Sequence, residues 1–189
     1  MMKVTFELSD RDLLYFRDCL KRVRGGARSA DERVVVAGAS RLVKDVLEGV
    51  VPEFVRERIL KLDQLIRMLQ DKEWRLEGDD RARVLNALAY FVDPDDLIPD
   101  KLPGIGYLDD AIMVELVVQE LRHEIEAYDD FCAFRTRARK ERSLDGGELE
   151  SRRVALQSRM RRRRMRERAS RRTRRGSERA RGRSPIGLW

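Results

Sequence analysis

The spacing of apolar and polar residues predicts one strand and one helix in the N-terminal part of the chain. Apolar residues alternate with polar ones over residues 3–8, which is the period of a half-buried strand. A single strand leaves its backbone groups unpaired, and a homodimer in which two copies of this strand meet would pair them. Ser9 is a good N-cap, and the first helix is predicted from there to Gly25 and Gly26.

Apolar residues at steps of three and four predict four more helices before residue 141. The second is expected at residues 30–49 with Ser29 as its N-cap, and the third begins at Pro52. The third helix is coiled-coil-like, but about two heptads are too few for a coiled coil, so a core-facing helix is the favoured interpretation. The fourth and fifth helices are expected at residues 80–91 and 109–140. The heptad-like stripe of the third helix consists of Val55, Ile59, Leu62, Ile66 and Leu69.

These elements predict an all-α fold, a compact bundle of about five helices with one short N-terminal strand. We expect a helical domain at residues 1–142, a linker at 143–150 and an Arg-rich tail at 151–189. No uncharged run approaches the roughly 18–20 apolar residues of a membrane span, so no transmembrane segment is predicted. The N-terminus also lacks the apolar core of a secretory signal, and a cytoplasmic location is the expectation.

The charge of the chain divides sharply between the predicted domain and the tail. The 189 residues have a formal net charge of +7. Residues 151–189 hold 16 Arg, no Lys and 2 Glu, a net charge of +14, which leaves −7 for residues 1–150. Apolar residues are sparse in the tail, so we expect it to be disordered or conditionally helical.

The content of histidine and cysteine limits the kinds of site that the chain can form. One His and two Cys exclude a site with several imidazoles, an all-cysteine zinc site and a disulfide scaffold. Cys19 and Cys132 have apolar neighbours on predicted helices, so both are expected to be buried structural thiols.

Residues 90–110 contain three of the five prolines and six aspartates. Each proline restricts its own backbone and that of the preceding residue, which predicts a rigid, non-helical loop. In the favoured interpretation the aspartates lock turns and cap the next helix. In the alternative they are hard oxygen ligands of Mg²⁺ or Ca²⁺, and no other cofactor is predicted. The candidate residues are Asp93, Pro94, Asp96, Pro99, Asp100, Pro103, Gly104, Gly106, Asp109 and Asp110.

This loop reads Asp-Pro-x-Asp-Leu-Ile-Pro-Asp, followed after two residues by Pro-Gly-Ile-Gly-Tyr-Leu-Asp-Asp. In order and spacing the run resembles the signature of the YkvA family (domain of unknown function 1232), over roughly residues 84–121. The resemblance implies a small helical domain from a mostly bacterial, largely uncharacterised family. Many similar proteins carry membrane-spanning segments beside the signature, but here the following helix is rich in charged residues. Asp95 departs from the pattern, since relatives often have an apolar residue there.

The tail contains dense clusters of arginine. Guanidinium groups bind phosphate bidentately, so nucleic acid is the first partner expected for the tail. Few aromatic residues interleave the arginines, which predicts electrostatic binding with a strong salt dependence. An anionic membrane surface, the acidic residues 1–150, or no partner at all are the alternatives. The candidate polyanion-binding residues are Arg161, Arg162, Arg163, Arg164, Arg166, Arg168, Arg171, Arg172, Arg174 and Arg175.

The sequence therefore predicts a YkvA-like interaction module without enzymatic activity, whose Arg-rich tail binds polyanions, nucleic acid first. Peripheral association with anionic membranes through the same tail is one alternative function. A metal-dependent enzyme that uses the Asp-rich loop is the other.

Overall fold

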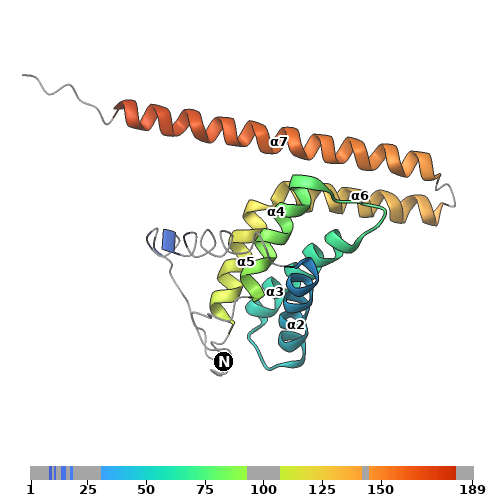
Figure 1. Cartoon of the computed structure of the whole chain (residues 1–189), viewed down its shortest axis with the longest axis horizontal. Coiled ribbons are helices and arrows are strands. Elements are labelled where there is room, and N and C mark those ends of the chain that lie inside the picture. Colours follow the sequence, from blue (N-terminus) through green and yellow to red (C-terminus); the bar gives the residue numbers. More distant parts are fainter. Residues whose placement is uncertain are drawn as a thin grey trace, which may run out of the picture. The chain divides into compact units, whose positions relative to one another are not determined.

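The computed structural model describes residues 31–92, 107–141 and 145–181, together with residues 9, 11, 14, 15 and 18. Side chains are described as far as Thr173, except those of Leu108 and Asp109. The predicted strand at residues 3–8, most of the first predicted helix and Cys19 lie outside these residues. Within the described part the chain is all-helical, which confirms the all-α prediction (Figure 1). The elements are α2 (Glu32–Glu48), α3 (Glu53–Gln70), α4 (Gly78–Leu88), the short 3-10 helix η2 (Ala89–Val92), α5 (Leu108–Glu120), α6 (Arg122–Lys140) and α7 (Gly146–Arg181).

The chain forms two compact units, residues 1–125 and residues 126–189. The first unit contains α2 to α5, and the second contains most of α6 and all of α7. None of the described helices is long and apolar enough to cross a membrane.

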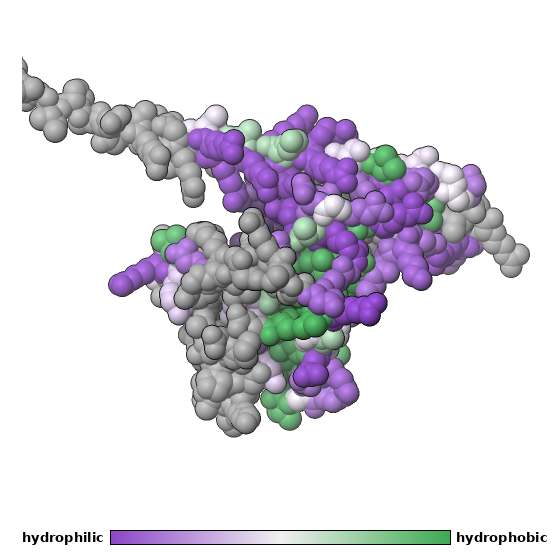
Figure 2. Space-filling view, viewed as in Figure 1, coloured by the Kyte–Doolittle hydropathy of each residue, from purple (hydrophilic) through white to green (hydrophobic). Residues whose placement is uncertain are grey.

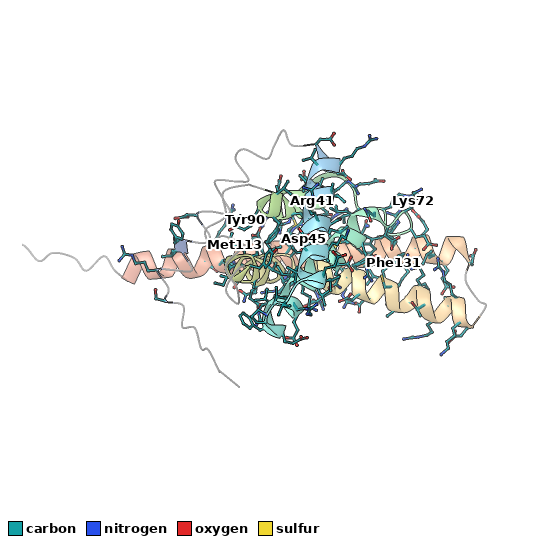
Figure 3. The ribbon with its side chains drawn as sticks, turned by 90° about the horizontal axis from the view of Figure 1, so that it is seen from below. Arg41, Asp45, Lys72, Tyr90, Met113 and Phe131 are labelled. Atoms are coloured by element: carbon teal, nitrogen blue, oxygen red, sulfur yellow. The ribbon has the colours of Figure 1, made fainter. Side chains whose placement is uncertain are left out.

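The core of the first unit is built around α3, which contacts α2, α4 and α5. All five residues of the heptad-like stripe on α3 are buried, so the prediction that this stripe faces a core is confirmed. Trp74 and Leu76, which follow α3, are buried as well. The side chains of Tyr90 and Met113, labelled in Figure 3, also belong to this core.

The ends of α2 are fixed by polar side chains. At its start, Asp31 is the N-cap, and its carboxylate accepts the backbone N–H of Arg33 at 2.8 Å. The predicted N-cap, Ser29, lies outside the described residues. At the end of α2, Arg56 donates to the carbonyl oxygens of Leu47 and Gly49 at 3.2 and 3.1 Å. Arg56 thus satisfies carbonyl groups that a helix C-terminus leaves without partners.

The predicted fifth helix is in fact two helices, α5 and α6, and the prediction of one continuous helix was wrong. Leu121 separates them, with φ −96° and ψ 13°. Its N–H still donates to the carbonyl oxygen of Val117 at 2.9 Å, and its carbonyl oxygen accepts the N–H of Ile125 at 2.9 Å. Both hydrogen bonds keep the helical spacing, so the periodicity of apolar residues continues across Leu121. That periodicity therefore predicts a single helix and gives no sign of the break.

Residues 151–181 of the Arg-rich tail belong to α7, which extends from Gly146 to Arg181. Its first turns therefore occupy residues 146–150, which the sequence assigned to the linker. The buried side chains of α7 include Leu149, Leu156 and Met160, and they recur along one side of the helix.

Candidate functional site

Three arginines of α7 contact side chains of α6 within the second unit. Arg163 pairs with Glu126 at 2.9 Å, and Arg159 pairs with Asp130 at 3.6 Å. The guanidinium carbon of Arg152 lies 5.5 Å from the centre of the Phe134 ring, which is a cation–π geometry. Since the partners ascend along α6 while the arginines descend along α7, the two helices form an antiparallel hairpin (Figure 1).

These contacts orient the arginines without contributing much to stability. In both ion pairs each side chain is about half exposed. Exposed pairs of this kind contribute roughly 0–1 kcal/mol because water and salt screen them. The acidic and aromatic residues of α6 therefore cover one side of α7 and neutralise part of its charge there.

Four further arginines of α7 are exposed, and they differ from those three in having no ion pair or cation–π contact with the described side chains of α6. Within the part of the chain that the structure describes, no acidic group pairs with their guanidinium groups. The neighbouring Arg171 pairs with Glu167 at 2.6 Å along the same helix, and Arg161 and Arg164 also have contacts. Figure 2 shows hydrophilic residues over much of α7, with few apolar ones among them. The four arginines are Arg162, Arg166, Arg168 and Arg172.

The positions of the other two candidate arginines are known from the backbone alone. Arg174 and Arg175 belong to α7, but their side chains lie outside the described residues. The ten candidate arginines thus all lie on one helix, and the structure separates four unpaired side chains from four that have contacts.

Most of the predicted Asp- and Pro-rich loop lies outside the described residues. This is true of Asp93, Pro94, Asp96, Pro99, Asp100, Pro103, Gly104 and Gly106. Asp109 and Asp110 are in the first turn of α5, where the sequence predicted a helix start, and the side chain of Asp110 is 7% exposed. Tyr107, just before α5, has φ 65°, a left-handed conformation that bulky residues rarely adopt.

Two arginines of α4 hold the first unit together through polar contacts that the sequence did not indicate. Arg81 donates from Nε to Glu32 Oε2 at 3.1 Å and also pairs with Oε1 of the same carboxylate. Its Nη1 donates to the carbonyl oxygens of Leu69 and Leu76 at 2.9 and 3.1 Å. Arg81 therefore connects the start of α2 to the end of α3 and to the segment before α4.

The second of these arginines, Arg83, joins α4 to the junction between α5 and α6. Its Nε donates to Glu124 Oε1 at 3.1 Å, and its Nη2 lies 4.0 Å from Glu120 Oε1. Glu124 is fully buried, and Arg83 supplies a charge-assisted hydrogen bond to its carboxylate. The sequence contains no signal for the pair, because 41 residues separate its members.

Residues 80–116 match the family model of DUF1232, a protein family of unknown function. The match confirms the resemblance seen in the Asp- and Pro-rich signature. It spans η2 and most of α4 and α5, and it contains both Arg81 and Arg83. A search of the curated proteins and a search of the solved structures each returned no match.

The DUF1232 match ends well before α7, so the family and the basic helix are separate features of the chain. Among the described residues, which include Asp110 but not the loop at 93–106, no three potential ligands form a group that could hold a metal ion. The metal-ligand interpretation of the DUF1232 loop stays a prediction.

The residues of the candidate site that the sequence analysis missed are mostly acidic residues that pair with arginines. Glu126 and Asp130 are ordinary acidic residues of a predicted helix, and nothing near them in sequence marks their pairing with α7. The four-residue step between them does place both on one side of a helix.

Proposed function

We propose that the protein is an interaction module that binds polyanions through α7, with nucleic acid ahead of other polyanions. The observation that carries the proposal is the group of four exposed arginines without an acidic partner among the described residues. They are Arg162, Arg166, Arg168 and Arg172.

The chemistry of arginine favours phosphate as the group that is bound. Guanidinium presents several N–H donors in a planar fork that matches two phosphate oxygens, and it stays charged at all relevant pH values. An arginine that already has a carboxylate partner must give up that interaction first, whereas the four unpaired side chains need not. Binding to them releases the counterions of the polyanion, so affinity should fall steeply as salt rises.

The composition of α7 supports charge as the source of affinity. Residues 146–173, whose side chains are described, include no aromatic residue, so stacking on single-stranded bases contributes nothing in this stretch. We therefore expect modest sequence selectivity. Association with anionic membranes is the competing function, and the experiments below distinguish it from nucleic-acid binding. An enzyme based on the Asp- and Pro-rich loop is the third.

The proposal is tested by neutralising the four arginines together in the full-length chain. We expect R162Q/R166Q/R168Q/R172Q to weaken binding to a fluorescent DNA duplex at least about a hundredfold near 0.1 M salt. The slope of log K against log salt should fall by about three to four, because each phosphate contact contributes roughly 0.9. Fluorescence anisotropy over a salt series measures both quantities.

A matched control removes four other exposed positive charges that have no ion pair among the described residues. The variant R33Q/R41Q/K61Q/K72Q lowers the net charge equally but changes only α2, α3 and the segment after α3. It should bind with nearly the affinity of the unchanged chain. Equal binding by the α7 variant and the unchanged chain at every salt concentration would overturn the proposal, as would tighter binding to anionic vesicles than to nucleic acid.

A further inference from the structure

We infer that the polyanion recognised by α7 is a B-form DNA duplex, with the outer face of α7 lying in the major groove. This inference rests on the proposed polyanion binding and adds the class of nucleic acid. It follows from how the four unpaired arginines are distributed around the helix axis.

The four arginines form two rows on the side of α7 that faces away from its buried residues. Successive residues of an α-helix are about 100° apart around the axis. Arg162 and Arg166 therefore lie on one flank, and Arg168 and Arg172 lie on the other, about 120° away. Met160, which is buried, lies about 160° from the midpoint between the two rows, on the side opposite the surface that separates them.

The surface between the two rows carries no charge. Met165 and Ala169 project from it, and their side chains are exposed, that of Met165 by 70%. One of these side chains is small, and the other is unbranched and flexible. The arrangement of two positive rows on either side of an uncharged ridge is the feature that selects among polyanions.

A B-form duplex matches this arrangement because its major groove is bordered by phosphates on both sides. The groove is about 12 Å wide, and an α-helix with its side chains is about 10–12 Å across. With the ridge pointing into the groove, each arginine row faces one of the two phosphate backbones. The arginines of both rows can then contact phosphate groups at the same time, one row on each backbone of the duplex.

The other nucleic acids fit less well. The major groove of A-form RNA is too deep and narrow to admit a helix, so duplex RNA would meet one row at a time. Single strands offer one backbone, and α7 has no aromatic side chain between 146 and 173 on which their bases could stack. We therefore expect duplex DNA to bind at least about tenfold more tightly than duplex RNA or single-stranded DNA of the same length and salt.

A substitution on the ridge tests how much the shape of this surface contributes to DNA binding when its charge is unchanged. Ala169→Phe places a bulky ring between the rows and leaves every charge in place. We expect it to weaken binding to duplex DNA about tenfold and to leave binding to heparin, a flexible polyanion without grooves, unchanged. Ser151→Phe is the matched control, since Ser151 lies on the same side of α7 about five turns before Ala169.

The two rows are tested one at a time in the full-length chain. R162Q/R166Q and R168Q/R172Q should each lower the salt slope on duplex DNA by about two, because each row contacts its own phosphate backbone. Circular dichroism at 222 nm should show the same helix content for all these variants.

Three results would overturn the inference while the proposed polyanion binding stands. One is equal affinity for duplex DNA, duplex RNA and single-stranded DNA. Another is an equal loss of heparin and duplex DNA binding in A169F. The third is a row variant with an unchanged salt slope. If none of the polyanions binds, the proposed function itself is wrong, and the inference falls with it.

Discussion

Arginine side chains in the first unit serve as connections between backbone segments. Arg56 donates to two carbonyl oxygens at the end of α2, and Arg81 donates to two carbonyl oxygens while it pairs with Glu32. Arg162 on α7 has no such contact among the described residues. The number of positive charges is thus a poor guide to binding surfaces, and the partner of each guanidinium is a better one.

Removal of the Arg81 side chain should destabilise the first unit. Arg81→Ala leaves the carbonyl oxygens of Leu69 and Leu76 without this donor, and it leaves Glu32 without its partner. We expect the free energy of unfolding to fall by about 2 kcal/mol, which is typical when partly buried acceptors lose a charged donor. Urea unfolding followed by circular dichroism measures this change. Arg33→Ala, at an exposed site on α2, should change stability by less than about 0.5 kcal/mol.

The ion pair between the partly buried Arg83 and the fully buried Glu124 allows a sharper test at the same scale. Arg83→Met leaves the fully buried carboxylate of Glu124 without this hydrogen bond, and we expect a loss of about 3 kcal/mol. Arg83→Met combined with Glu124→Leu removes both charges and should recover part of that loss. A double variant no more stable than R83M in urea unfolding would contradict the assignment of the cost to the loss of the Arg83 partner of Glu124.

At the scale of elements, the sequence predicted those features that depend on local periodicity. The α3 stripe and the start of α3 after Pro52 follow from spacing and from the fixed backbone of proline. The separation of α5 from α6 at Leu121 was missed, because the helical hydrogen bonds continue through it. The cap on the end of α2 was missed as well, since its donor, Arg56, belongs to the next helix.

The contact between α2 and η2 is another feature that periodicity does not predict. Gly38 lies in the middle of α2, and a Cβ atom there would be 2.7 Å from Cγ2 of Val92. Gly38→Ala gains about 0.5–1 kcal/mol of helix propensity, but the stiff branched side chain of Val92 opposes it. We expect a net loss of about 1 kcal/mol in thermal or urea unfolding.

A second variant shows whether Val92 causes that loss. Val92→Ala removes both methyl groups that a Cβ at position 38 would meet. G38A in the V92A background should be neutral or stabilising, so that the two substitutions are strongly non-additive. An equal effect of G38A in both backgrounds would show that Val92 is not what limits the approach of α2 to η2.

At the scale of the whole molecule, the sequence predicted where the charge lies. It did not predict which arginines lack an acidic partner and are available to bind a polyanion. The division into −7 for residues 1–150 and +14 for residues 151–189 needs only counting. Availability depends on Glu126 and Asp130, which reach Arg163 and Arg159 only once the chain has turned back on itself. The DUF1232 signature was recognised from residue order, and its loop lies outside the described residues.

Local stability should also vary along α7, and trypsin can report it. Side chains of residues 149–160 include several buried ones, whereas those of residues 168–173 are all exposed. Opening of the helix should therefore cost less free energy beyond Glu167. Among the arginines of the described helices, we expect Arg168 and Arg172 to be cleaved before Arg56 and Arg58 of α3. Intact-mass analysis of a short digest measures the order.

Bound duplex DNA should slow the cleavage at Arg168 and Arg172 and leave the cleavage in α3 unchanged. Protection of both regions to the same degree would indicate a general effect of DNA on the protease. Cleavage of α3 before α7 would contradict the difference in local stability.

The pairing of α6 with α7 limits the number of polyanions that one chain can bind. In an isolated helix the arginines that contact α6 would be available as well as the four outer ones, and such a helix can bridge two polyanions and condense them. Glu126, Asp130 and Phe134 occupy the side of α7 that would otherwise accept a second polymer. Each chain should therefore take up one duplex at a time, with a stoichiometry of one to one and no crosslinking of DNA at equimolar ratios.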